Sequence, residues 1–361
     1  MTHEEIFTFP TAQNFSPLRQ EYLFGVIGTA HTHIIGMSQG LLAAGAKLAA
    51  VYDPDPAALA VFLRHFPDTK VVQSPEQILC DPAVRLIASA AVPSDRAGIA
   101  IAAMEAGKDC MVDKAPLISL EQLAALKATI AKTGRKYSVY YGESIDNEAA
   151  LFARDLLSRG VIGKLCHVDG FAPHRLNAPS RPAWFFQFAK TGGILTDLVC
   201  HQLHQFLAFL DAQGLPTDVV PVASRVGNLF HSELGELQDF GDTMYTAACG
   251  VSGYFRVDWN SPEGLSTWGD SRMILSGEDG CIELRKNCDI ARSKGGNHIY
   301  IVNRQGEFYE NVSGKIQKTY FPRFIRESLE GYADPHALQL DLDAIELTIR
   351  AQMAAVDIAG T

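Results

Sequence analysis

Three side chains in one short segment have the spacing of a proton-transfer site. Asp197, His201 and His204 are separated by four and three residues, so a helix over residues 193–210 would place them on one face. A histidine titrates near neutral pH and can exchange a proton with a hydroxyl or carbonyl oxygen, while a carboxylate one turn away can orient it. The same spacing also fits a metal site with one remote ligand, or a solvated helical turn without chemistry. The spacing alone leaves these three interpretations open.

Lys114 is the second candidate, because it follows an apolar strand predicted over residues 109–112. Parallel sheets bind ligands at the carboxyl ends of their strands. A lysine there can hydrogen-bond both a nucleotide ribose and a substrate oxygen, whereas an ordinary surface lysine is the alternative. The loop over residues 172–190 contains His174 and Trp184, which we expect to line a pocket for a polyhydroxylated ligand.

The elements that must position these side chains start with a strand–turn–helix–strand unit. An apolar run over residues 22–27 ends at Gly28, a helical pattern follows over residues 33–44, and a second apolar run ends at Asp53. Such a βαβ unit is typical of dinucleotide binding, in which the pyrophosphate lies at the helix N-terminus and the acid binds the ribose hydroxyls. The alternative is that Asp53 is only an acidic residue in the turn that ends the strand.

The glycine fingerprint of this unit is incomplete. Gly28 supplies the tight turn, but Ala30 and His33 occupy the places of the second and third glycines. Asp53 lies 25 residues after Gly28, near the usual spacing, and its charge would repel a 2′-phosphate, so we expect NAD rather than NADP. The predicted cofactor contacts are Gly28, Ala30, His31, Asp53, Pro93 and Lys114.

The pattern of strands and helices divides the chain into two domains. Strands alternate with helices to about residue 140, which predicts a parallel, doubly wound Rossmann sheet. Short consecutive strands over residues 218–308 predict an α+β domain with an open, mostly antiparallel sheet. We therefore expect an N-terminal arm (1–21), either mobile or packed on a neighbour, a nucleotide-binding domain (22–145) and a domain for substrate binding and oligomerisation (146–361). An open sheet is a common dimerisation surface, so a homodimer or homotetramer is expected.

The composition excludes several classes of partner. The 361 residues carry a net charge of −10, which argues against nucleic-acid binding. There is no apolar run of about 18 residues that would span a membrane, and the N-terminus lacks the pattern of a secretory signal. The seven cysteines form no CxxC motif and are expected to be reduced thiols of a cytoplasmic protein.

Several stretches together resemble the Gfo/Idh/MocA family, the glucose–fructose oxidoreductase and inositol dehydrogenase group. They are GVIGTAHTH, AAVYDPDP, AIAAMEAGKDCMVDKAPL, SRGVIGKLCHVDGF, GGILTDLVCHQLHQFLAFL and ILSGEDGCIELRK, in the family's order. The resemblance implies a Rossmann domain followed by an α+β domain. It places Lys114 at the lysine of the family's Glu-Lys-Pro motif, although this chain has Asp113-Lys114-Ala115 there. Asp197 and His201 match the family's Asp-x-x-x-His motif, and His204 stands where the family often has an acid.

The resemblance implies an NAD-dependent dehydrogenase for a secondary alcohol of a sugar, cyclitol or related polyol. In this interpretation His201 exchanges the proton, Asp197 orients it, and Lys114 aids cofactor and substrate placement. His174, Trp184 and His204 are the predicted substrate contacts, and no metal is expected. Two alternatives stay open: an NAD-dependent glycoside hydrolase on the same scaffold, and a non-catalytic protein that senses a nucleotide or sugar.

Overall fold

The alternating first part of the chain folds into a parallel sheet, as the sequence predicts. In this computed structural model, which describes residues 2–359, its strands have the order β2-β1-β3-β4-β5, and every neighbouring pair is parallel. The strands are β1 Leu23–Ile27, β2 Lys47–Tyr52, β3 Val84–Ser89, β4 Asp109–Asp113 and β5 Tyr137–Tyr140. The strand order reverses between β1 and β3, so the carboxyl ends of these strands flank the crevice where such sheets bind ligands.

Helices pack on both faces of this sheet. Alternate strand residues face different cores: on β3, Leu86 contributes to the core with α2, whereas Ile87 contributes to the core with α5 and α6. Asp55 and Ser119 cap the starts of α3 and α6 with their side chains. The helices are α2 His33–Ala43, α3 Pro56–His65, α4 Glu76–Leu79, α5 Pro93–Glu105 and α6 Leu120–Thr133.

The second part of the chain forms a larger, mostly antiparallel sheet, which confirms the predicted α+β domain. Its order is β13-β12-β11-β10-β6-β9-β8-β7-β14, and only the β6–β9 and β7–β14 pairs are parallel among these described strands. The strands are β6 Leu165–Pro173, β7 Val219–Gly227, β8 Phe240–Ala247, β9 Ser252–Asp258, β10 Arg272–Gly277, β11 Gly280–Arg285, β12 His298–Asn303, β13 Gly306–Asn311 and β14 Val356–Asp357.

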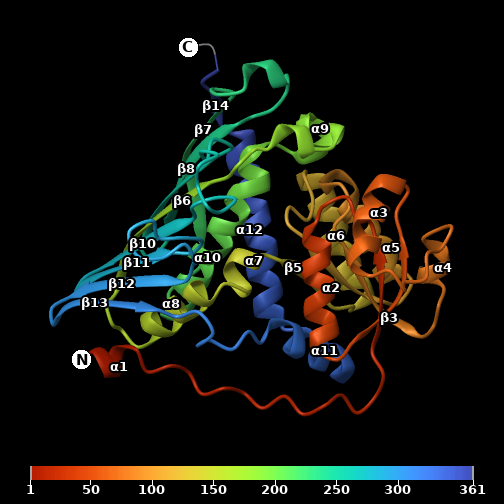
Figure 1. Ribbon diagram of the computed structural model, residues 1–361, viewed down its shortest axis with the longest axis horizontal. Helices are drawn as coiled ribbons and strands as arrows, with labels where there is room; N and C mark the ends of the chain where they lie inside the picture. Colours follow the sequence, from red (N-terminus) through yellow and green to blue (C-terminus); the bar gives the residue numbers. More distant parts are fainter. Residues whose placement is uncertain (1, 360–361) are drawn as a thin grey trace.

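Two long helices lie between the second sheet and the Rossmann domain. Figure 1 shows α10 (Cys200–Ala212) and α12 (Pro335–Met353) in this central position, with the second sheet on one side and α2 and α5 on the other. The short helix α7 (Gly142–Ile145) and α8 (Glu148–Ser158) connect the two domains and contact α10. No helix within residues 2–359 is both long and apolar enough to cross a membrane.

Two segments cross over between the domains in a way that the sequence pattern did not indicate. Helix α11 (Tyr320–Glu330) belongs to the second half, yet Phe321 and Phe324 are buried in the core with α2. In the other direction, α1 (His3–Ile6) and the following residues pack on the second domain, where the Phe7 ring stacks on Phe152. The start of the arm is therefore packed on its own chain, and the expected contact of the arm with a neighbouring subunit stays a prediction.

Truncating Phe324 is expected to destabilise the fold. Its side chain is buried, and its ring lies 5.0 Å from the ammonium of Lys136, so Phe324→Ala opens a cavity between α11 and the first sheet. Changes of this kind cost about 3–5 kcal/mol. The midpoint of urea unfolding measures the effect, with exposed Phe230→Ala as the matched control. Equal midpoints for the two variants would contradict the docking of α11.

Candidate active site

The carboxyl ends of the parallel strands supply one half of the candidate site. Gly28 follows β1, Asp53 follows β2, Lys114 follows β4, and Glu143 lies three residues after β5. The segment that leads into α10 supplies the other half from the second domain. The site therefore forms where the two domains meet, at the edge of the sheet that the sequence predicts.

Lys114 and Asp197 form a buried ion pair across this junction. The Lys114 Nζ lies 2.8 Å from a carboxylate oxygen of Asp197, and the two side chains are 5% and 16% exposed. Burial alone would raise the pKa of Asp197, but the ammonium of Lys114 outweighs it and lowers that pKa overall. Burial likewise lowers the pKa of Lys114, and the carboxylates of Asp197 and Asp113 raise it above its ordinary value. Both members of the pair are therefore charged.

A π-helical turn separates the side chains that the sequence placed on one helical face. The structure has a π-helical turn at Leu195–Val199 before α10, rather than one continuous α-helix. Asp197 in this turn reaches Lys114, while His204 on α10 lies 2.7 Å from Ser144 Oγ and 3.2 Å from Asp341. No hydrogen bond joins Asp197 to His201 among residues 2–359. Such π turns recur at functional sites because they change the direction of side chains.

His201 is a neutral, buried imidazole at the centre of the site. Its side chain is only 4% exposed, and its Nδ1 has no hydrogen-bond partner in the described part of the chain. Burial lowers the pKa of His201 to about 3; the carboxylate of Glu143 opposes this shift, and Lys114 adds to it. At neutral pH the ring is thus uncharged and able to accept a proton.

Glu143 is the charged neighbour of His201. One carboxylate oxygen of Glu143, Oε2, accepts hydrogen bonds from Lys286 Nζ at 2.6 Å and Ser271 Oγ at 3.1 Å. Burial raises the pKa of Glu143, but the cation Lys286 and the nearby His201 and His174 lower it overall. This residue therefore places a negative charge where the sequence analysis had expected only Asp197.

His174, which the sequence analysis predicted as a substrate contact, lies beside Glu143. Its Nδ1 lies 2.9 Å from the carbonyl oxygen of Ala172, and its Nε2 lies 4.0 Å from Glu143 Oε1. The ring packs against Trp259 and Trp268, with centroids 5.3 and 4.6 Å away. Burial lowers the pKa of His174 to about 4, so it is neutral at pH 7.

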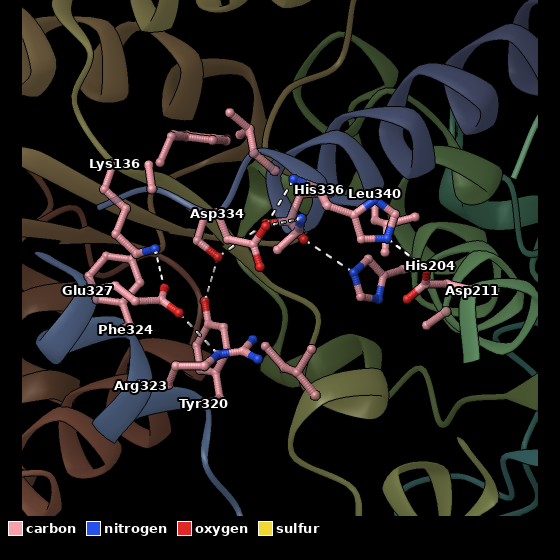
Figure 2. Close-up of a pocket in the computed structure, with 18 of the residues that line it drawn as sticks. Lys136, His204, Asp211, Tyr320, Arg323, Phe324, Glu327, Asp334, His336 and Leu340 are labelled. Carbon is pink, nitrogen blue, oxygen red and sulfur yellow. Dashed lines mark hydrogen bonds and ion pairs between the residues drawn. The ribbon is translucent and has the colours of Figure 1, made fainter. Parts of the chain in front are cut away.

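His204 lies in a different cavity from the other candidates. Figure 2 shows it beside Asp211, His336 and Leu340, in a cavity of about 230 Å³ between α10, α11 and α12. Both ring nitrogens of His204 have protein partners, Ser144 and Asp341, rather than His201 or His174. The predicted substrate contact of His204 stays a prediction, with no support from its position.

Asp197, His201 and His204 do not bring their ligand atoms close enough together to share a metal ion. Among the residues that the structure describes, the group close enough to hold a metal is His31, His33 and Asp113. The buried Asp113 carboxylate already lies 2.9 Å from His33 Nδ1, 3.3 Å from His31 Nδ1 and 3.1 Å from the guanidinium of Arg96. Arg96 therefore supplies the positive charge that a cation would bring.

A second cavity, of about 360 Å³, lies beside the ends of β1 and β2 and suits the adenosine part of a dinucleotide. Its lining includes Gly28, Ala30, Asp53 and, from the second domain, Trp184. Gly28 has φ +89°, and a Cβ there would lie 2.4 Å from the Cβ of Ala91, so only glycine fits this turn. Of the predicted cofactor contacts, Gly28, Ala30 and Asp53 line this cavity, whereas His31, Pro93 and Lys114 are not among its lining residues.

The carboxylate of Asp53 is held at the rim of this adenosine cavity. It accepts hydrogen bonds from the backbone N–H and the hydroxyl of Thr29. Pro93 lies nearby, buried at the start of α5.

Trp184 was predicted to contact the substrate together with His174. It lines the adenosine cavity instead.

Comparison with known proteins agrees with this geometry in both domains. Residues 23–141 match the model of the oxidoreductase family with an NAD-binding Rossmann fold, and residues 151–283 match the GFO/IDH/MocA C-terminal domain. A solved structure from Erwinia carotovora atroseptica SCRI1043 is 41% identical, with a TM-score of 0.89 over 94% of this chain and 100% of that one. The chain belongs to the Gfo/Idh/MocA family.

Curated relatives are more distant. The scyllo-inositol 2-dehydrogenase (NAD(+)) of Bacillus subtilis is 27% identical over 76% of this chain and 77% of its own. The Escherichia coli protein YdgJ is 32% identical, but the match covers only 43% of each chain.

Within this Gfo/Idh/MocA chain, three residues escaped the sequence analysis. Arg96 is buried, and its guanidinium binds Asp113 and donates to the carbonyl oxygens of Lys114 and Ala115, which fixes the Lys114 segment. Glu143 follows the last parallel strand, so the rule that pointed to Lys114 would also have found it. Lys286 had no signal, because it reaches the site only through the pairing of distant strands.

Proposed function

We propose that this protein is an NAD-dependent oxidoreductase acting on a secondary alcohol, or the corresponding carbonyl, of a sugar, cyclitol or related polyol. The observation that carries the proposal is the charged Lys114–Asp197 pair beside the neutral His201, at the edge of the sheet next to the nucleotide cavity. The activity named for the Bacillus subtilis relative supports the same substrate class.

The residues divide the reaction between them. Bound NAD supplies the hydride acceptor in the oxidation direction. Lys114 donates a hydrogen bond to the substrate oxygen and stabilises the negative charge that develops on it. His201 takes the hydroxyl proton, so that the loss of a hydride and a proton leaves a carbonyl group. Asp197 holds the ammonium of Lys114 in place. The sequence analysis had instead expected Asp197 to orient His201.

Assays with the full chain test this proposal. Purified protein with NAD and, separately, scyllo-inositol, myo-inositol or D-glucose is followed at the absorbance band of NADH. The proposal predicts NADH formation with at least one polyol. If NAD binds but none of the polyols is oxidised, and the corresponding ketones are not reduced, the protein acts as a nucleotide sensor rather than a dehydrogenase.

Cofactor choice follows from the charges around the adenosine cavity. Its lining contains four acids, Asp53, Asp55, Glu76 and Asp95, and no lysine or arginine within the described residues. A 2′-phosphate would meet this negative rim, so we expect NADH to bind at least about tenfold more tightly than NADPH. Asp53→Ser is expected to lower the ratio of the Kd for NADPH to the Kd for NADH, with both constants measured by nucleotide fluorescence. Exposed Asp68→Ser is the matched control, and an unchanged ratio in Asp53→Ser would contradict this role.

A further inference from the structure

Glu143 presents one unused carboxylate oxygen to the candidate active site. Its Oε2 accepts both hydrogen bonds of the carboxylate, from Lys286 and Ser271. Its Oε1 accepts none from any residue between 2 and 359, and the closest ion-pair partner is His174 Nε2 at 4.0 Å. The Glu143 side chain is 14% exposed, so a ligand can reach this oxygen.

A buried network fixes this carboxylate relative to His201. Lys286 is only 1% exposed and binds Glu143 on one side and Gln205 Oε1, at 3.2 Å, on the other. Gln205 in turn donates a hydrogen bond of 3.0 Å to the carbonyl oxygen of His201. Because each member is held by its neighbour, Glu143 Oε1 has a defined position beside the proton-transfer residue, as a pre-organised binding group requires.

The tautomer of His174 makes its free nitrogen an acceptor as well. Its Nδ1 faces the carbonyl oxygen of Ala172, which can only accept a hydrogen bond, so Nδ1 carries the proton of the neutral ring. The Nε2 therefore offers a lone pair. Two acceptors, Glu143 Oε1 and His174 Nε2, lie 4.0 Å apart without a donor between them, which is a separation that two hydroxyl groups on adjacent carbons can span.

The charges of the site exclude an acidic ligand at this point. The ammonium of Lys114 is neutralised by Asp197, and that of Lys286 by Glu143, at 2.8 and 2.6 Å. His174 and His201 are both uncharged at pH 7, because burial lowers the pKa of each. A carboxylate or phosphate would thus find no unpaired cation among these groups, and would lie next to the acceptor oxygen Glu143 Oε1.

We propose that Glu143 Oε1 and His174 Nε2 form a subsite for a vicinal diol, so that the substrate is an uncharged polyol with a free hydroxyl on the carbon next to the reacting one. This inference rests on the proposed function and deepens it. Glu143 and His174 accept the hydroxyls that are not oxidised, which leaves the reacting hydroxyl to Lys114 and His201.

Direct binding measurements test the subsite without any chemical step. Trp268 and Trp259 pack on His174, so their fluorescence reports a ligand that contacts it. Each of scyllo-inositol, myo-inositol and D-glucose, which carry vicinal diols, is titrated into the full chain, and cyclohexanol serves as the ligand without one. In Glu143→Gln we expect the Kd of the tightest polyol to rise about tenfold to a hundredfold, the range for hydrogen bonds to a charged group. Binding of NADH should be unchanged.

A matched control and a double variant separate binding from structural damage. Glu148→Gln changes another buried carboxylate, which binds Asn297 and Gly314 away from the site, and should leave polyol binding unchanged. Glu143→Gln with Lys286→Met removes both charges, so weak binding in this variant supports direct contact. Recovery of the original Kd would show that only the unpaired Lys286 had mattered, and would overturn the proposal.

The remaining outcomes separate this inference from the proposed function. Polyol oxidation by the original chain together with unchanged polyol binding in Glu143→Gln overturns the subsite but not the dehydrogenase. Polyol binding that depends on Glu143, without oxidation or ketone reduction, supports the subsite and rejects the dehydrogenase. No binding of any of the three polyols overturns the subsite directly.

Discussion

Lys114→Met is expected to lower kcat/KM for polyol oxidation by about 10²- to 10³-fold, the usual effect of removing one donor that stabilises developing oxyanion charge. The ammonium is buried and held 2.8 Å from Asp197 at the carboxyl end of β4, where the proposed mechanism places the substrate oxygen. Methionine keeps the length and apolar character of the side chain but removes the charge. Steady-state kinetics with the best polyol measure the loss.

Lys136→Met is the matched control for this substitution. Lys136 is also mostly buried and lies 2.7 Å from a carboxylate, that of Glu327, but it stands at the start of β5, at the opposite edge of the sheet. Its substitution should change stability more than turnover. An equal loss of kcat/KM in the two variants would show that Lys114 acts through folding, and an unchanged rate in Lys114→Met would remove it from the mechanism.

His201→Ala is expected to lower kcat by about 10²- to 10⁴-fold, because general acid–base help of this size is lost with the ring. The neutral state of His201 follows from burial, which lowers its pKa to about 3, so the ring enters the oxidation reaction ready to accept the proton. NADH binding should persist, since His201 belongs to the second domain and the adenosine cavity lies at the ends of β1 and β2. Rapid-mixing kinetics and a nucleotide titration measure the two quantities.

His167→Ala controls for the removal of an imidazole from the same domain. His167 lies on β6, is a third exposed and pairs with Asp169, away from the site. Its loss should leave kcat within about twofold of the original chain, in line with the small effects of surface substitutions. A His201→Ala protein with the original kcat would assign the proton transfer to another group.

Local sequence patterns predicted most of the fold. The βαβ unit ending at Asp53 and the change to short strands after residue 218 both reflect interactions between neighbouring residues, and the structure has them. Helix α11 was missed because it begins with Tyr320, Phe321 and Pro322, an unusual start for a helix; its stability comes from burial on α2, a contact between segments about 280 residues apart. Phe321, Phe324 and Ile325 do have helical spacing, but this pattern does not indicate that they pack on α2 in the other domain.

The candidate site was predicted only in part, for a related reason. Lys114 could be located because the carboxyl end of a parallel strand is a known ligand position. Asp197, His201 and His204 were expected on one face of a continuous helix, but Asp197 lies in a π turn before α10, and His204 contacts Ser144 and Asp341. Nothing in the local sequence specifies this turn. Lys286 and Glu143 lie 143 residues apart and meet only when β11 and α7 are assembled. Charge networks of this kind depend on the tertiary fold.

The fate of the carbon-bound hydrogen tests the central claim most directly. The full chain is incubated with NAD and with scyllo-inositol, myo-inositol or D-glucose that carries deuterium on its ring carbons, and the reduced nucleotide is analysed by mass spectrometry. A dehydrogenase with the site described here predicts one deuterium in each NADH formed, together with a ketone or lactone product. Reduced nucleotide without deuterium, or deuterium released to water without net reduction of NAD, would contradict direct transfer from the alcohol carbon.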